Sequence, residues 1–275
     1  MKPPPFAYAR ATSVEHALAL LAEGGEDAKP IAGGQSLVPA LAYRLVRPTH
    51  LVDIGRLDDE LGQVRAADNG LRLGALVRHR TLADREGEPC WHGLRGAARH
   101  IGHDAIRVRG TIGGSLVHAD PAAELPVAIV ALGGDLVVRT VEGSRVVGAE
   151  EFFVAPFTTA VAPGELLVEI RLAAPPPQAR TAFSEFAPRA GDFATVCVFA
   201  GLGPGWARIA VGGVGGTPVR VPRAEALAAA GALDDAAGAA ARDIEVYGDR
   251  FADENYRRAL VRAVTRRALA EVQPA

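Results

Sequence analysis

The chain has 275 residues, of which 49% are hydrophobic and 23% charged, and its formal net charge is −2. This composition is typical of an ordinary globular protein with one or two domains, and the slightly negative charge argues against bulk nucleic-acid binding, which needs a basic surface. No apolar run approaches the roughly 20 residues of a membrane-spanning helix, and no secretory signal peptide opens the chain, so we expect a cytoplasmic location.

The cysteines and histidines predict no metal centre in this chain. Cys90 and Cys197 are the only cysteines, whereas an iron–sulfur cluster takes about four cysteine ligands. Two distant thiols also suggest no disulfide framework. His100 and His103 lie three residues apart, but no cysteine or carboxylate pattern completes a zinc site around them.

Residues 1–56 predict a small β-α-β unit. Thr12 and Glu15 have the spacing of a capping box, and Gly24-Gly25 ends the helix that this box opens. Ser36 is expected to cap a second helix directly after the turn Gly33-Gly34, where helix N–H groups favour a phosphate. The predicted elements are an edge strand ending at Arg10, a helix from Val14, a strand over 29–32, a helix through 41–45 and a strand over 50–54.

Residues 57–173 show an α+β pattern instead of regular βαβ alternation. The alternating stretch 136–147 predicts a hairpin around Glu142-Gly143. The other predicted elements are strands over 71–75 and 168–172 and helices over 80–84, 91–101 and 121–132.

A proline run at 174–177 is the clearest linker, so we place a domain boundary near Pro176. Beyond it the sequence predicts three strands over 181–187, 196–201 and 206–211, then an alanine-rich helical stretch after a glycine cluster, and a long terminal helix over 253–271. The glycine cluster 212–216 could form a phosphate loop, but we favour a structural turn. Arg258, Arg262 and Arg266 form one row on the terminal helix, which is either a solvated face or a docking surface for a partner.

Two segments share an unusual pattern of an apolar residue, two glycines and a Ser-Leu pair. They are Ile31-Ala32-Gly33-Gly34-Gln35-Ser36-Leu37 and Ile112-Gly113-Gly114-Ser115-Leu116. Glycines let backbone N–H groups approach an anion closely, so the pattern predicts two loops that converge on one diphosphate. Two purely structural turns are the alternative. Neither segment has the lysine of a P-loop or the spacing of a dinucleotide-binding fingerprint.

On these residues the chain resembles the FAD-binding medium subunit of the molybdenum hydroxylases, the carbon monoxide dehydrogenase and xanthine dehydrogenase family. The resemblance covers nearly the whole chain, including 32–39, 109–126, 151–163, 189–194 and 212–220. It implies an α+β fold with a two-lobed FAD-binding domain of the vanillyl-alcohol-oxidase or p-cresol-methylhydroxylase type. The lobes would span about 1–56 and 57–176, followed by a smaller α/β domain of the carbon monoxide dehydrogenase flavoprotein type over 177–275.

The resemblance also implies a site for non-covalent FAD. The glycine turns would hold the pyrophosphate through backbone N–H groups, with hydroxyls as further donors. The implied cofactor-binding residues are Ala32, Gly33, Gly34, Gln35, Ser36, Leu37, Ile101, Thr111, Ile112, Gly113, Gly114, Ser115, Asp120, Glu124, Asp192 and Phe193.

Several of these assignments have alternatives. Ile101 would lie against the flavin or in the core, and Phe193 beside the isoalloxazine or in the core. Glu124 stands where relatives carry an aspartate that bonds the adenosine portion, and Asp120 has capping of the following helix as its alternative role. Glu185 stands about where several relatives have a lysine near the flavin ring, with Arg189 as a candidate substitute.

The implied function is electron transfer. FAD would accept electrons from [2Fe–2S] clusters of an iron–sulfur small subunit and pass them to NAD, a quinone or oxygen. Molybdopterin would belong to a large subunit, and the complex would be a dimer of heterotrimers. No catalytic acid–base group is identified in this chain. A self-contained flavin-dependent oxidoreductase and a flavin-free scaffold that keeps the fold are the alternatives.

Overall fold

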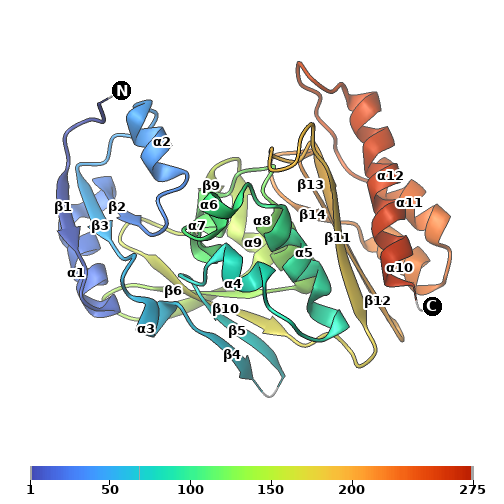
Figure 1. Cartoon of the computed structure of the whole chain (residues 1–275), viewed down its shortest axis with the longest axis horizontal. Helices are drawn as coiled ribbons and strands as arrows, with labels where there is room; N and C mark the ends of the chain where they lie inside the picture. Colours follow the sequence, from blue (N-terminus) through green and yellow to red (C-terminus); the bar gives the residue numbers. More distant parts are fainter. Residues whose placement is uncertain (1, 68, 274–275) are drawn as a thin grey trace.

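The computed structural model describes residues 2–67 and 69–273, which form three main sheets with helices packed on them (Figure 1). The first lobe is a parallel sheet of order β1-β3-β2, as expected for a β-α-β unit. Its elements are β1 (Ala7–Arg10), α1 (Val14–Gly24), the 3₁₀ turn η1 (Gly25–Asp27), β2 (Ala28–Ile31), α2 (Leu37–Ala42) and β3 (His50–Asp53).

Helix α1 packs on this sheet through Val14, Leu18 and Leu21, which recur at helical spacing and are buried. The predicted capping box is wrong by one residue. Ser13, not Thr12, accepts the N–H of His16, because the Thr12 hydroxyl bonds the His16 ring instead.

The second lobe is built on an antiparallel sheet of order β4-β5-β10-β6-β7. Its strands are β4 (Val64–Ala67), β5 (Gly70–Gly74), β6 (Asp135–Arg139), β7 (Ser144–Gly148) and β10 (Leu166–Ala173). The hairpin predicted around Glu142-Gly143 is confirmed as β6–β7. The remaining elements are α3 (Asp58–Leu61), α4 (His79–Ala83), η2 (Pro89–Trp91), α5 (His92–His100), α6 (Asp104–Arg107), α7 (Ile112–His118), α8 (Glu124–Leu132), α9 (Ala149–Phe152), β8 (Phe153–Ala155) and β9 (Thr158–Thr159).

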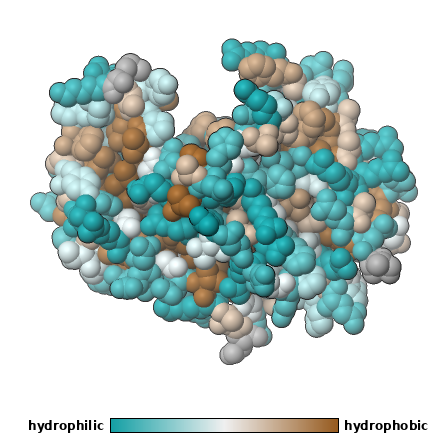
Figure 2. Space-filling view, in the orientation of Figure 1, coloured by the Kyte–Doolittle hydropathy of each residue, from teal (hydrophilic) through white to brown (hydrophobic). Residues whose placement is uncertain are grey.

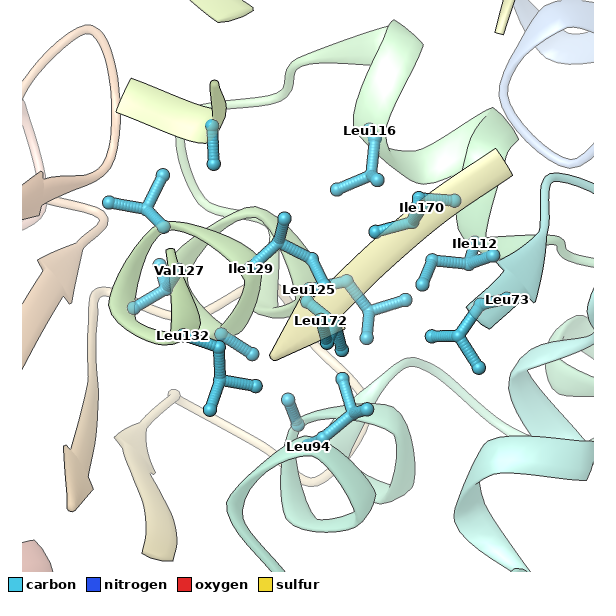
Figure 3. Close-up of a cluster of buried hydrophobic side chains, with 14 of the residues drawn as sticks. Leu73, Leu94, Ile112, Leu116, Leu125, Val127, Ile129, Leu132, Ile170 and Leu172 are labelled. Atoms are coloured by element: carbon cyan, nitrogen blue, oxygen red, sulfur yellow. The ribbon is translucent and has the colours of Figure 1, made fainter. Parts of the chain in front are cut away.

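Helix α8 is the centre of the main core. Every one of its residues is buried, which explains why the run from Leu125 to Leu132 is apolar on all sides. Leucine and isoleucine side chains of β5, β10, α5 and α7 surround it (Figure 3). The helix was predicted to begin at Pro121 but begins at Glu124. The Asp120 side chain accepts the Ala122 N–H, which forms a separate turn before the helix.

The C-terminal part is an antiparallel sheet of order β11-β12-β13-β14, covered on one side by three helices (Figure 1). Its elements are β11 (Arg180–Phe186), β12 (Val196–Gly203), β13 (Trp206–Gly212), β14 (Val219–Arg220), α10 (Pro222–Ala229), α11 (Leu233–Arg242) and α12 (Glu254–Val272). Alternate residues of β12 face opposite sides. Cys197 and Phe199 join the main core on the side of α5 and α8, whereas Val196 and Val198 join a second core beneath α10–α12.

The glycine cluster after β13 is a structural turn, as favoured. Gly213 has a φ of +77° and donates its N–H to the carbonyl of Pro121 at 2.9 Å. Its own carbonyl accepts from the buried Arg257.

The arginine row on α12 is partly used within the chain. Arg258 donates to the carbonyls of Ala241 and Ile244 at 2.8 and 3.1 Å, and Arg266 pairs with Asp234 at 3.0 Å. These contacts fasten α12 to the α11 region, so they weaken the docking interpretation of the row. None of the helices in residues 2–67 and 69–273 is long and apolar enough to cross a membrane.

Candidate cofactor site

The first glycine segment follows β2 at the carboxyl end of the parallel sheet and leads into α2. Gly34 has a φ of +74°, a conformation that glycine adopts without strain. Within the part of the chain that the structure describes, the N–H groups of Gly33, Gly34, Gln35 and Ser36 donate no hydrogen bond. Ser36 occupies the cap position of α2, but its side chain makes no capping bond, contrary to the prediction. Successive unbonded N–H groups of this kind form an anion-binding site.

The two glycine segments meet in space. A Cβ atom on Gly33 would lie 2.2 Å from the carbonyl oxygen of Arg109 and 3.0 Å from the Cα of Gly110. Only glycine allows this approach. The structure therefore brings the first segment against the residues that immediately precede Thr111.

The second segment is the start of helix α7, and the prediction that it forms a loop is wrong. Thr111 caps α7, and its side chain accepts the N–H of Gly114 at 3.1 Å. The N–H groups of Ile112 and Gly113 donate to the carbonyls of Val77 and Ala75 at 2.9 and 2.8 Å. The Ser115 N–H donates to the Thr111 carbonyl at 3.0 Å. This segment therefore presents a helical face, whereas the unbonded N–H groups belong to the first segment.

That helical face is open to a ligand at Gly114. Gly113 is buried, and a Cβ there would lie 2.6 Å from the Cβ of Ala75, so Gly113 serves close packing. Gly114 is exposed, and among the described residues outside the backbone of α7 an added Cβ would meet just the Thr111 Oγ1, at 2.8 Å. Ser115 is half-buried beside it. A large ligand can lie flat on this surface because no side chain blocks it.

A groove of about 500 Å³ adjoins the first segment, and the molecule is visibly hollowed between the first lobe and the rest (Figure 2). It is lined by Tyr8, Ile31, Ala32, Gly33, Gly34, Gln35, Val38, Pro39, Asp53 and Arg109. Tyr8, Asp53 and Arg109 were not among the predicted site residues. Asp53 follows two buried residues of β3, Leu51 and Val52, at the carboxyl end of the parallel sheet. This position was the signal that could have revealed it as a site residue.

The Asp53 carboxylate is held by three donors. It accepts from the Tyr8 hydroxyl, from Arg10 Nε at 3.3 Å and from the Gly55 N–H at 2.8 Å. Burial alone would raise the pKa of Asp53, but these hydrogen bonds outweigh it and lower the pKa. The carboxylate therefore stays charged while its charge is compensated by Arg10.

Ile101 and the Asp192-Phe193 segment lie at a second edge of the site. Arg107 holds the end of α5 by donating to the carbonyls of Ile101 and Gly102, both at 2.9 Å. A Cβ on Gly191 would lie 2.6 Å from the His103 ring, so the β11–β12 loop rests on this segment. Phe193 is 61% exposed, which excludes the core alternative for its side chain.

The other two side chains assigned to this edge are charged. Asp192 pairs with Arg189 at 3.0 Å, and the Arg189 side chain is 84% exposed. Arg189 is therefore a solvent-exposed cation tied to its own loop.

Glu124 and Glu185 form an acidic pair at the seam between α8 and the C-terminal sheet. Glu124 is 3% exposed, and Glu185 lies opposite Cys197 in the β11–β12 pairing. Oε2 of Glu185 is buried without a hydrogen-bond partner in the described residues. Glu124 thus lies away from the groove-lining residues, near Glu185, which does not favour its predicted contact with the adenosine portion.

Burial raises the pKa of both carboxyl groups. The pKa of Glu124 rises to about 8, mainly through burial and further through the charges of Glu185 and Asp120. Burial also raises the pKa of Glu185, although His100 and Arg267 oppose this. A protonated carboxyl group is therefore held at this seam near neutral pH. Across residues 2–67 and 69–273, no group of three or more His, Cys, Asp or Glu residues is placed to hold a metal ion.

Two family models match the chain. Residues 4–175 match the FAD binding domain in molybdopterin dehydrogenase, and residues 181–272 match the CO dehydrogenase flavoprotein C-terminal domain. The chain is 41% identical to the 6-hydroxypseudooxynicotine dehydrogenase complex subunit alpha of Paenarthrobacter nicotinovorans, covering 98% of this chain and 95% of that one. It is 32% identical to the carbon monoxide dehydrogenase medium chain of Afipia carboxidovorans, covering 97% and 99%.

Solved structures agree with these matches. A chain of quinoline 2-oxidoreductase from Pseudomonas putida 86 superposes with a TM-score of 0.91 at 35% identity, covering 99% of this chain and 98% of that one. A chain of the Cu,Mo-CO dehydrogenase gives a TM-score of 0.91 at 31% identity, covering 99% of both.

Proposed function

The chain belongs to the family of FAD-binding subunits of molybdenum hydroxylases, and from this premise we propose that its first glycine segment holds the FAD pyrophosphate. It is the FAD subunit of a multi-subunit oxidoreductase and has an electron-transfer role. When bound, FAD supplies the redox chemistry, since it accepts electrons singly and releases them as a pair.

The observation that carries this proposal is the run of unbonded N–H groups from Gly33 to Ser36. They face a groove that also contains Arg109, so the electrostatics suit a diphosphate. We assign the open face at Gly114 and Ser115 to the same ligand. The flavin ring would then extend toward Ile101 and Phe193, with the FAD clasped between two lobes as in the vanillyl-alcohol-oxidase or p-cresol-methylhydroxylase type.

We further propose that FAD is non-covalent and that the domains span 1–176 and 177–275. Burial of both cysteines supports non-covalent binding. The electrons would come from [2Fe–2S] clusters of a small subunit, with molybdopterin on a large subunit, in a cytoplasmic dimer of heterotrimers. NAD, a quinone or oxygen would be the acceptor.

The proposal is tested by reconstituting the purified chain with excess FAD, removing unbound flavin by gel filtration and recording the visible spectrum. We expect one FAD per chain, and acid precipitation should release it into the supernatant. Gly33→Ala should abolish retention, because its Cβ would collide with the Arg109 carbonyl. Gly87→Ala is the matched control, since none of the described residues lies within 4 Å of the added atom. Failure of the unaltered chain to retain FAD would refute the proposal, and yellow flavin in the acid pellet would refute non-covalent attachment.

A further inference from the structure

Arg78, between β5 and α4, connects the two lobes at the cofactor site. Its Nη1 donates to the carbonyl of Arg109 at 2.7 Å. Its Nη2 donates to the carbonyl of Gly55, in the loop after β3, at 3.2 Å and lies 3.4 Å from the Asp58 carboxylate. A single guanidinium therefore spans from the first lobe to the backbone that leads into α7. The planar fork of arginine suits this role, because it directs several donors at fixed angles.

His79, the next residue, holds the following two carbonyls. Its backbone N–H donates to Gly110 at 3.0 Å, and its ring Nε2 lies 2.9 Å from the carbonyl oxygen of Thr111. A carbonyl only accepts, so Nε2 carries the ring proton. Nδ1 is then a bare acceptor, buried without a partner in the described residues and packed against Gly110. Burial lowers the pKa of His79 to about 4, so the ring stays neutral with this tautomer at neutral pH.

Arg78 and His79 thus donate hydrogen bonds to three consecutive carbonyl groups, those of Arg109, Gly110 and Thr111. The first of these is also the oxygen against which Gly33 packs. Carbonyl oxygens carry partial negative charge, so any that faced the groove would repel a diphosphate. An unpartnered buried nitrogen such as His79 Nδ1 is costly, and a leucine would avoid that cost. The Nε2 proton of the histidine supplies a second hydrogen bond to the Thr111 carbonyl, which also accepts the Ser115 N–H at 3.0 Å.

We propose that Arg78 and His79 are positioning residues for the FAD site, which fix the Arg109–Thr111 backbone so that the two glycine segments stay in contact. They do not touch the cofactor themselves. The inference rests on the proposed placement of FAD at the first glycine segment. It predicts that FAD affinity depends on the donors of residues 78 and 79, not on their charge or bulk.

The test compares four variants of the full chain: Arg78→Met, His79→Leu, His79→Gln and Arg80→Met. Glutamine keeps a side-chain N–H donor near the position of Nε2, whereas leucine does not. Arg80 is a matched control, because it is mostly exposed and pairs with Asp84. FAD dissociation constants are measured by fluorescence titration, together with the visible circular dichroism of bound flavin and the thermal midpoint of the FAD-free chain. All titrations are run well below each midpoint.

We expect Arg78→Met and His79→Leu to weaken FAD binding about tenfold or more, as for loss of a hydrogen bond between site-forming groups. Their flavin circular dichroism should change. His79→Gln should bind within about threefold of the unaltered chain, and Arg80→Met should match it. Equal affinities for His79→Leu and His79→Gln, or unaltered affinity and dichroism in Arg78→Met, would overturn the inference. If Arg78→Met is insoluble, the His79 pair decides alone. Absence of FAD binding in the unaltered chain would refute the FAD site itself.

Discussion

The Glu124 carboxyl group should make the stability of this protein depend on pH. Its pKa rises from an ordinary value of 4.5 to about 8 because the group is buried at the start of α8. The folded chain therefore binds this proton more tightly than the unfolded chain. The corresponding stabilisation is complete below pH 4.5, declines as pH rises and is lost above about pH 8.

The size of the effect follows from the pKa difference. About 3.5 pH units at roughly 1.36 kcal/mol each give an upper limit of about 5 kcal/mol. Glu124→Gln keeps the shape of the protonated acid and cannot ionise. The variant should thus match the unaltered chain near pH 4.5 and exceed its free energy of unfolding by several kcal/mol at pH 8.5. Removing the charge also relieves repulsion with Glu185.

Urea unfolding of the FAD-free chain at pH 5.5, 7.0 and 8.5 measures this difference. Other groups that titrate independently contribute equally to the free energies of unfolding of variant and parent, so their contributions cancel in the difference. Glu23→Gln is the control for the same substitution at an exposed site, because Glu23 is exposed on α1. A Glu124→Gln difference that stays constant between pH 5.5 and 8.5 would refute the reasoning, since the carboxyl group would then titrate alike in both states.

Three further outcomes are expected. Gly114→Val should weaken FAD binding by over a hundredfold, because its side chain fills the open face and keeps the diphosphate from the N–H groups of residues 33–36, where two or three contacts at about 1.5–3 kcal/mol each would be lost. Titration with FAD should show no loss of affinity for Gly143→Val, in the exposed hairpin. Equal losses of affinity in the two variants would mean that the face at Gly114 is wrongly assigned to FAD. Glu185→Lys should raise the flavin reduction potential by about 30 mV or more, because a cation stabilises reduced flavin. An unchanged potential in dye-equilibrium titrations would mean that residue 185 is too far from the flavin to affect it electrostatically. The isolated chain should be reducible by dithionite yet fail to oxidise aldehydes or purines at ordinary enzyme rates of about 1–1000 per second; turnover in that range in steady-state assays would favour a self-contained flavoenzyme.

Periodicity and turn residues predicted most of the fold. Alternating apolar residues identified the β6–β7 hairpin and the strands β11, β12 and β13. The β-α-β reading of the first lobe matches its parallel sheet. These features succeed because the signal is local: each depends on the spacing of side chains within one element. Strand β4 and helix α6, each of four residues, are too short to produce such a signal.

The errors concern hydrogen-bond partners that are distant in sequence. The glycines of 113–114 suggested an open turn, but Val77 and Ala75 supply carbonyls that engage the N–H groups of Ile112 and Gly113. No local pattern reveals whether a backbone donor is already bonded elsewhere. The same limit applies to Arg78, whose importance lies in bonds to residues 55 and 109.

The seam between α5 and the C-terminal sheet has a consequence for folding. Gly93 and Gly96 let α5 approach β11 and β12 so closely that added Cβ atoms would contact Phe199 at 2.5 Å and Phe183 at 3.1 Å. The Thr181 hydroxyl accepts the Gly93 N–H and donates to the Cys90 carbonyl. This is the density of a protein interior, not of an interface between independent bodies. The two regions that the family models match, 4–175 and 181–272, should therefore unfold in one cooperative transition. A fragment that ends at the proline linker would expose the apolar face that the C-terminal sheet covers in the full chain.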